Sequence, residues 1–233
     1  MKAVDFDRFA DEYQSIHAQN IGISGESPDY FAEYKVKDLG TEFHAIRSRD
    51  IECPKILDFG AGIGTSLPYF RKYLLNPCVT CLDVSKKSLD IGKVRFPGEA
   101  DFIHFIGSRL PFSNSCFDIA FAACVFHHID HCEHTLFFKE FHRVLTPDGL
   151  ALIFEHNPYN PLTVKAVNTC PFDEYACLIK ASTLRRRLIE AGFSRVEIRY
   201  RIFFPHFLRI LRPAERMMMW IPFGAQYYAL AFK

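Results

Sequence analysis

A glycine-rich turn in the first third of the chain has the residue types that bring a backbone close to a cofactor. Gly60, Gly62 and Gly64 follow the apolar run 55–59 with the spacing G-x-G-x-G. A strand that leads through such a turn into a helix can hold a nucleotide-like ligand against its backbone N–H groups. The spacing is shorter than the G-x-G-x-x-G that is typical of dinucleotide binders.

Two aspartates near this turn indicate which ligand it would accept. Asp58 sits two residues before Gly60, inside the end of the apolar run. A carboxylate there would repel a pyrophosphate, whereas it suits a cofactor that carries an ammonium and a sulfonium group. Asp83 lies 19 residues past Gly64, at the end of the next apolar run, where it can accept hydrogen bonds from both hydroxyls of a ribose.

The elements that must position these residues are predicted from an alternation of short apolar runs with amphipathic stretches. The runs lie at residues 55–59, 78–84, 101–106, 117–126 and 149–155, and two further runs lie at 195–204 and 225–232. Short, almost entirely apolar strands between helices indicate a parallel sheet that is buried on both faces. The first fifty residues are predicted to be helical, with a loop marked by Gly and Pro at 21–28.

Five segments follow one another in an order that is typical of one family. They read ILDFGAGIG at 56–64, LDVS at 82–85, LPFSNSCFDI at 110–119, VFHHI at 125–129 and RVLTPDG at 143–149. Together they resemble the motifs of class I S-adenosylmethionine-dependent methyltransferases of the general small-molecule type. The resemblance implies a Rossmann-like α/β fold, with a seven-stranded, mostly parallel sheet whose last strand is antiparallel, helices on both faces and an N-terminal helical cap.

The same resemblance implies a set of residues that bind S-adenosylmethionine. The set is Tyr13, Asp58, Gly60, Ala61, Gly62, Asp83, Val84, Ile106, Ser108 and Ala123. Tyr13 resembles an N-terminal tyrosine that closes over the carboxylate end of the cofactor in related enzymes; alternatively, its helix merely packs on the sheet edge. Members of the family often have an acidic residue shortly before the LPF segment for the adenine amino group. Here residues 105–108 read FIGS, so we expect the backbone near Ile106, or Ser108, to contact adenine.

The residues that act on the acceptor are expected beyond the carboxyl ends of the strands. In methyl transfer from a sulfonium the leaving group is already activated, so positioning supplies most of the catalysis, and a base serves to take the proton of an oxygen or nitrogen acceptor. We predict that His128, after the run 117–126, is this base. We predict that Glu155 orients the base or the acceptor. Alternatively, the histidine packs or hydrogen-bonds the backbone, and Glu155 caps a helix or faces solvent.

A metal site is not predicted, although potential ligands crowd one stretch. These residues are His127, His128, His131, Cys132 and His134. The stretch passes from a strand end into a helix, and no second pair of ligands completes a zinc-binding frame. The eight cysteines lie mostly in apolar segments and are expected to be reduced, buried thiols of a cytoplasmic protein.

Composition and motifs limit the classes of partner. Lys and Arg number 28 against 27 Asp and Glu, a net charge of +1, so no overall field attracts a polyanion. Residues 123–128 read ACVFHH and lack the N/D-P-P-Y/F motif of enzymes that methylate nucleic-acid bases. We therefore expect no nucleic-acid partner. No run approaches the about 18 apolar residues of a membrane span, and the N-terminus has no apolar core of a signal peptide.

The chain is predicted to comprise a helical cap at residues 1–50 and a cofactor-binding methyltransferase domain at 51–233. Segments 157–181 and 205–224 are longer than ordinary connections, and we expect them to form acceptor-site or lid insertions. Segment 205–224 is rich in apolar residues and would form either a lid over the site or the surface of a homodimer.

Three functions from different classes remain open. The first is methyl transfer from S-adenosylmethionine to an oxygen or nitrogen atom of a small molecule. The second is an NAD-dependent oxidoreductase, which the glycine spacing and Asp58 disfavour. The third is a catalytically silent cofactor-binding module, which the joint presence of Asp58, Asp83 and His128 disfavours.

Overall fold

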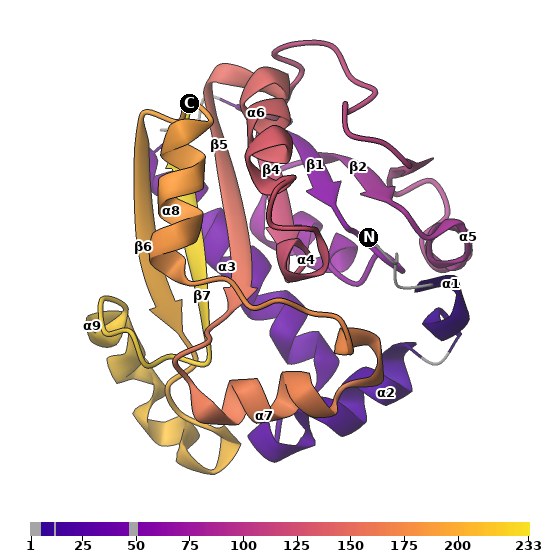
Figure 1. Ribbon diagram of the computed structural model, residues 1–233. Coiled ribbons are helices and arrows are strands. Elements are labelled where there is room, and N and C mark those ends of the chain that lie inside the picture. Colours follow the sequence, from indigo (N-terminus) through magenta and orange to yellow (C-terminus); the bar gives the residue numbers. More distant parts are fainter. Residues whose placement is uncertain (1–5, 12, 47–50) are drawn as a thin grey trace.

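A single seven-stranded sheet forms the centre of the molecule. The computed structural model describes residues 6–11, 13–46 and 51–233, without the side chains of residues 9, 13, 14, 17 and 23. The strands are β1 (Lys55–Phe59), β2 (Cys78–Asp83), β3 (Asp101–His104), β4 (Phe117–Ala123), β5 (Leu145–His156), β6 (Arg195–Arg201) and β7 (Gln226–Phe232). Their order across the sheet is β3-β2-β1-β4-β5-β7-β6 (Figure 1).

The sheet has the predicted directions. Strands β3, β2, β1, β4 and β5 pair in parallel, and β7 pairs antiparallel with both β5 and β6. The mostly parallel sheet with an antiparallel last strand is therefore confirmed. The strand order reverses between β1 and β4, and the crevice at the carboxyl ends of strands at such a reversal is where open α/β sheets bind ligands.

Helices cover both faces, as predicted. One face packs against α6 (His134–Val144) and α8 (Ala181–Glu190), and the other packs against α3 (Pro28–Ile46), α4 (Leu67–Tyr73) and α5 (Lys86–Arg95). Each strand supplies alternate side chains to the two cores, which is why the strands read as almost continuous apolar runs. In β4, for example, Ala120 and Ala122 enter the core beneath α6, and Phe121 enters the core beneath α4.

Several strand ends differ from the sequence-based expectation. Strand β4 ends at Ala123 because Cys124 has a left-handed backbone (φ 60°), which turns the chain out of the sheet and into the short helix η2 (Phe126–His128). Strand β5 begins at Leu145, so the predicted turn at 146–149 lies within it. There the pairing with β4 shifts register between Phe117 and Ile119, and this irregularity accommodates the turn residues.

The N-terminal region contributes three further helical segments besides α3. These are α1 (Phe6–Phe9), α2 (Tyr13–Asn20) and η1 (Ile21–Ser24). Helix α3 is fixed to the sheet by the ring of Tyr34, which packs edge-on against Phe154 of β5 with 5.8 Å between centroids. It is also held by Asp38, whose carboxylate accepts a hydrogen bond from Arg201 Nε at 2.5 Å. Both contacts join α3 to strands distant in sequence.

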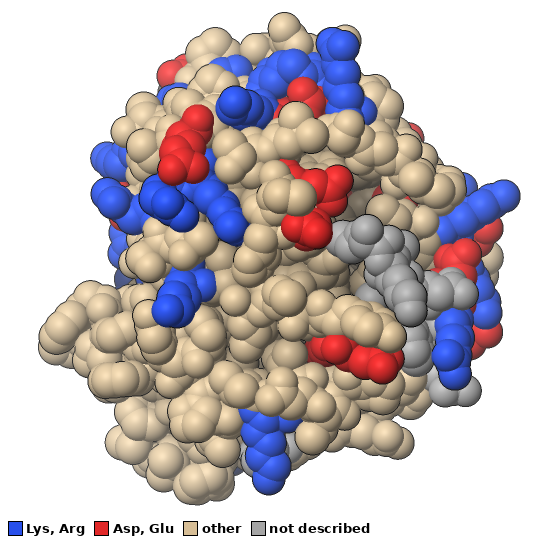
Figure 2. Space-filling view, in the orientation of Figure 1, with Lys and Arg blue, Asp and Glu red and all other residues tan. Residues whose placement is uncertain are grey.

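The two predicted insertions contain short helices. Segment 157–181 holds α7 (Pro161–Thr169) and η3 (Pro171–Asp173), and segment 205–224 holds η4 (His206–Ala214) and α9 (Glu215–Met218). Apolar side chains exposed in the second segment are Phe207, Ile210, Leu211, Met217, Trp220 and Phe223. Figure 2 shows little charge on this part of the face, whereas basic and acidic side chains are interspersed elsewhere. A homodimer through 205–224 stays a prediction.

Among the residues that the structure describes, no helix combines the length and the apolar character that a membrane crossing requires.

The contact between Phe154 and α3 predicts a large stability effect. Phe154 is fully buried and packs against Tyr34, Phe121 and Tyr228. Phe154→Ala is expected to lower the free energy of unfolding by about 3–5 kcal/mol, because the cavity left behind collapses only partly. Phe207→Ala, at a side chain that is 80% exposed, is expected to change it by less than about 0.5 kcal/mol. Denaturant unfolding of both variants tests this, and equal effects would contradict the packing described.

Candidate active site

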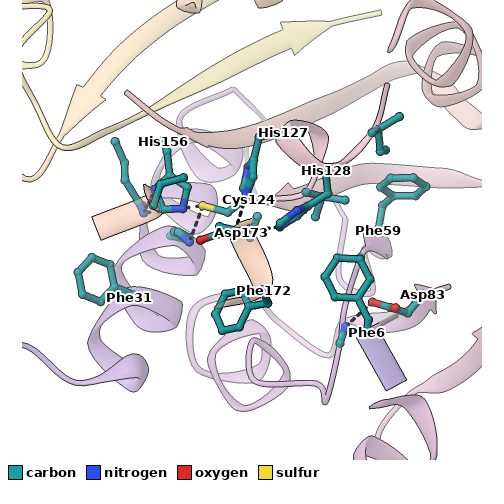
Figure 3. Close-up of a pocket in the computed structure, with 18 of the residues that line it drawn as sticks. Phe6, Phe31, Phe59, Asp83, Cys124, His127, His128, His156, Phe172 and Asp173 are labelled. Atoms are coloured by element: carbon teal, nitrogen blue, oxygen red, sulfur yellow. Dashed lines mark hydrogen bonds and ion pairs between the residues drawn. The ribbon is translucent and has the colours of Figure 1, made fainter. Parts of the chain in front are cut away.

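A cavity of about 950 Å³ opens at the carboxyl edge of the sheet. Its walls come from the loop after β1, the ends of β2, β4 and β5, the N-terminal helices, and α7 with η3. Figure 3 shows Asp83 and Phe59 towards one end of this cavity and Cys124 and His156 towards the other, with His128 between them. The cavity therefore joins Asp83 and the glycine loop, predicted to bind the cofactor, to His128, predicted to act on the acceptor.

The glycine loop has the backbone that its sequence predicts. Gly60 and Gly62 both have positive φ angles, 76° and 54°, which favour glycine. A Cβ atom on Gly60 would lie 2.4 Å from Val125 Cγ2, so a side chain there would collide with the segment after β4. A Cβ on Gly62 would meet no atom within 4 Å. The loop is thus packed closely at Gly60 and open to the cavity at Gly62.

Asp83 at the end of β2 is held by the same loop. Its Oδ2 accepts a hydrogen bond from the N–H of Gly62 at 2.7 Å, and its Oδ1 accepts one from the N–H of Ser85 at 2.8 Å. Burial raises the pKa of Asp83, while these backbone hydrogen bonds oppose the rise. Each carboxylate oxygen retains acceptor capacity, so the fixed carboxylate can still accept hydrogen bonds from ribose hydroxyls.

Asp58 is a buried acid with an unsatisfied oxygen. It is 2% exposed, and its Oδ2 has no hydrogen-bond partner among the described residues. Burial, and then the nearby charge of Asp83, raise the pKa of Asp58 to about 8. A buried carboxyl oxygen without a hydrogen-bond donor destabilises the folded protein unless a bound ligand supplies the donor. The ammonium group of an amino-acid-like cofactor has the charge and the donors that would do so.

The other predicted cofactor residues divide into three groups. Val84, Ile106, Ser108 and Ala123 line the cavity, together with Gly60, Gly62 and Asp83. Asp58, in β1, and Ala61, in the loop that follows it, adjoin these residues without lining the cavity wall. Tyr13 begins α2, but its side chain lies outside the described residues, so its role stays a prediction.

Glu155, at the end of β5, is fully buried and holds His127. Its Oε2 lies 2.7 Å from Nδ1 of His127, and its Oε1 accepts the N–H of Phe126 at 2.8 Å. Burial opposes a charge on His127, but the carboxylates of Glu155 and Asp173 outweigh it and raise the pKa of His127 to about 10. The structure therefore places Glu155 against His127, whereas the predicted base is His128.

His128 lines the cavity in a different environment. Its Nε2 is 3.3 Å from Oδ1 of Asp173, its ring packs edge-on against Phe6 at 5.2 Å, and its buried Nδ1 has no hydrogen-bond partner among the described residues. Burial and the adjacent charge of His127 lower the pKa of His128 to about 3. The imidazole is therefore neutral at physiological pH and has a free nitrogen, but it is a weak base.

A further set of polar side chains surrounds Cys124, at the end of the cavity opposite the glycine loop. The Lys35 ammonium is 3.3 Å from Cys124 Sγ and is almost fully buried. Burial alone would raise the pKa of Cys124, but Lys35 and His156 outweigh it and lower that pKa to about 7. Gln226 Nε2 is 3.4 Å from His156 Nδ1. This end therefore offers a buried cation and several hydrogen-bonding groups to a bound molecule.

Sequence reasoning missed several of these residues. Lys35 belongs to an amphipathic helix in which a lysine normally faces water, and Asp173 belongs to a long loop with no recognisable motif. The sequence does offer a signal for His127 as a site residue, since it adjoins His128 at the end of a predicted strand. Nothing local distinguishes Cys124 from the other apolar-segment cysteines.

Comparison with known proteins identifies the domain. Residues 57–153 match the family model described as a methyltransferase domain. A demethylmenaquinone methyltransferase of Chlorobaculum parvum is 28% identical over 162 residues, which is 69% of this chain and 62% of the relative. The match thus spans less than two thirds of the relative's own length.

Solved structures share the fold over most of the chain. An S-adenosylmethionine-dependent methyltransferase of Thermotoga maritima superposes with a TM-score of 0.66 at 16% identity, covering 98% of this chain and 97% of that one. Phosphoethanolamine N-methyltransferase 2 of Haemonchus contortus, in complex with S-adenosylmethionine, superposes with a TM-score of 0.60 at 16% identity, covering 88% and 56%. Residues 57–153 therefore form a methyltransferase domain, and the fold of the chain is that of S-adenosylmethionine-dependent methyltransferases.

Proposed function

We propose that this protein transfers the methyl group of S-adenosylmethionine to an oxygen or nitrogen atom of a small-molecule acceptor. The observation that carries the proposal is the single cavity that runs from Asp83 and the glycine loop to the polar groups around Cys124. A donor at one end and an acceptor at the other would meet near His128. Positioning of this kind, with water excluded, can supply most of the rate enhancement of a displacement reaction.

The cofactor end has matched partners for each part of the donor. S-Adenosylmethionine supplies an electrophilic methyl group on a sulfonium. Asp83 would accept the ribose hydroxyls, and Asp58 would balance the positive charge of the amino-acid part. Val84 and Ile106, which are 54% and 79% exposed, would lie against the adenine ring and lose that exposure when the cofactor binds.

The acceptor end favours a molecule with an apolar body and an oxygen atom. The rings of Phe31 and Phe172 line part of its wall (Figure 3), while Lys35 offers a buried positive charge. An oxygen that carries negative charge, or accepts hydrogen bonds, would satisfy the lysine. The name of the Chlorobaculum parvum relative gives demethylmenaquinone as its substrate, and this supports a small-molecule acceptor.

Cofactor binding is expected to depend on Asp83. Calorimetric titration should show saturable binding of S-adenosylmethionine and S-adenosylhomocysteine and none of NAD. Asp83→Ala should abolish detectable binding, because it removes the hydrogen-bond acceptors for the ribose and the anchor of Gly62. Asp118→Ala, at the amino end of β4, serves as a control for a lost carboxylate, since Asp118 does not line the cavity. Binding of NAD alone would instead favour an oxidoreductase.

Asp58 predicts a pH dependence of cofactor affinity. In the free protein its pKa is raised to about 8, so the carboxyl is mostly protonated at pH 7. A cationic cofactor favours the ionised form, so binding should release a proton, and affinity should rise with pH up to about 8 and then level off. Titrations in buffers of different ionisation enthalpy measure this proton release. Since the cofactor's own amino group also titrates, Asp58→Asn is the necessary comparison, and an unchanged proton release in Asp58→Asn would contradict the assignment.

His128 is expected to matter for turnover and not for cofactor binding. It contacts the cavity between the two ends, so His128→Gln should strongly lower methyl transfer to a true acceptor while leaving the affinity for S-adenosylmethionine intact. Acceptors found by screening phenols, quinols and amines with radiolabelled cofactor provide the assay. Full turnover in the variant would remove His128 from the acceptor site.

A further inference from the structure

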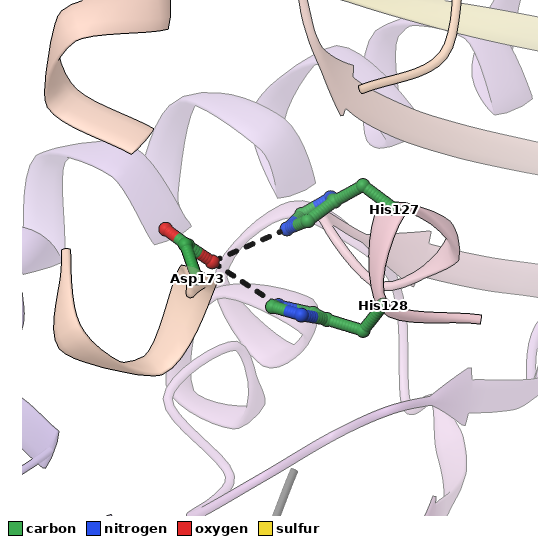
Figure 4. A group of neighbouring side chains, drawn as sticks. All are labelled: His127, His128 and Asp173. Atoms are coloured by element: carbon green, nitrogen blue, oxygen red, sulfur yellow. Dashed lines mark ion pairs between the residues drawn. The ribbon is translucent and has the colours of Figure 1, made fainter. Parts of the chain in front are cut away.

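Two histidines and an aspartate converge inside the cavity from separate segments. His127 and His128 lie in η2, directly after β4, and Asp173 ends η3, 45 residues further along the chain. Figure 4 shows both imidazole rings pointing towards the Asp173 carboxylate. All three residues line the cavity, so the cluster is reached from the space that a substrate would occupy.

The separations within this cluster are those of metal ligands. Nε2 of His128 lies 3.3 Å from Oδ1 of Asp173, and Nε2 of His127 lies 3.5 Å from the same oxygen. The three ligand atoms all lie within 4.8 Å of one another. Ligands bound tetrahedrally at about 2.0–2.1 Å from zinc are separated by about 3.3 Å, so only small side-chain rotations would be needed to close the site.

Glu155 orients one of the ligands, as a carboxylate hydrogen-bonded to a metal-binding histidine would. Because Nδ1 of His127 is bonded to Glu155 at 2.7 Å, Nε2 is left to face Asp173. A metal-binding histidine characteristically gives its other ring N–H to a carboxylate or carbonyl, which fixes its tautomer and orientation. The Glu155 carboxylate is itself fixed by the N–H of Phe126. The support for His127 is therefore rigid and fully buried.

The local charge also favours a cation. Glu155 and Asp173 are both buried carboxylates, at 0% and 7% exposure, and both contact His127. One imidazolium can balance only one of these two charges. From β5, the ring of His156 also faces the cluster, 5.1 Å from that of His127, and Cys124 interacts with His127 as well. A divalent cation between the three ligand atoms would displace the Nε2 proton of His127 to solvent and balance both carboxylates.

We propose that His127, His128 and Asp173 bind a divalent cation of the zinc type in the wall of the cavity. Three protein ligands leave a fourth coordination position, as in catalytic and not structural zinc sites. That position is available to water or to an oxygen of the bound acceptor, whose proton the cation would make easier to lose. The metal site itself does not depend on the proposed function, whereas this role towards the acceptor rests on it.

Titration of chelator-treated protein with Co²⁺ and Zn²⁺ tests the proposal. Calorimetry should give one Zn²⁺ per chain, and Co²⁺ should give the visible absorption of a four-coordinate site with nitrogen and oxygen ligands. His128→Ala and Asp173→Asn should each weaken Zn²⁺ binding at least about tenfold, and Glu155→Gln should weaken it by about 10–100-fold, as loss of an outer-shell partner does.

The controls separate this site from other sources of binding. His131→Ala should bind Zn²⁺ like the unaltered protein, since His131 is exposed and does not line the cavity. Binding of S-adenosylhomocysteine by every variant verifies that it is folded. Absence of stoichiometric binding, binding that survives both His128→Ala and Asp173→Asn, or thiolate-to-cobalt absorption would overturn the metal site. Cofactor binding without Zn²⁺ binding would refute the metal site alone, and the reverse would refute the proposed function alone.

Discussion

The cost of burying charge at the carboxyl edge of the sheet organises this site. Asp58, Glu155 and Asp173 are all less than 10% exposed, and a carboxylate taken out of water is destabilising by several kcal/mol unless a partner compensates it. Glu155 and Asp173 share His127, which becomes a stronger base as a result. Among the described residues Asp58 has no partner for Oδ2, and its pKa is instead raised to about 8. Without a ligand, the buried carboxylates at the acceptor end are thus partly compensated, whereas the carboxyl group of Asp58 at the cofactor end is not.

The parallel sheet is what brings these acids together. Asp58 of β1 lies opposite Phe121 of β4, and two residues further along β4 Ala123 lies opposite Phe154 of β5, so Asp58 and Glu155 lie near the ends of two strands that flank β4, at the same edge of the sheet. Because parallel strands share a direction, every polar residue placed at a strand end adds to one crevice. The apolar residues in the interior of the same strands are buried against helices on both faces, and the free energy of this burial offsets the cost of the concentrated charge.

The sequence predicts the features that depend on local spacing. The glycine turn, Asp58 and Asp83 follow from a pattern within about thirty residues, and the parallel sheet follows from an alternation of strands and helices that reaches across the chain. It does not predict the meeting of Asp173 with His127, or of Lys35 with Cys124 across 89 residues, since no periodicity encodes the path of a long connection. Strand ends were also misplaced where backbone conformation decides them, as the left-handed backbone of Cys124 ends β4.

The two ends of the cavity differ in whether their residues come from neighbouring or from distant segments of the chain. The cofactor end is formed by loops that directly follow β1 and β2, and Asp83 accepts hydrogen bonds from one residue of each loop, Gly62 and Ser85. The acceptor end is assembled from α3, η2 and η3, elements that only the tertiary fold unites. His127 is fixed there by strand β5 through Glu155, whereas Asp173 arrives on a connection between α7 and α8. Helix α3 and η3 lie outside residues 57–153, the part of the chain that matches the methyltransferase-domain model, whereas the loops after β1 and β2 lie within it, so the acceptor end depends on connections that the domain match does not cover.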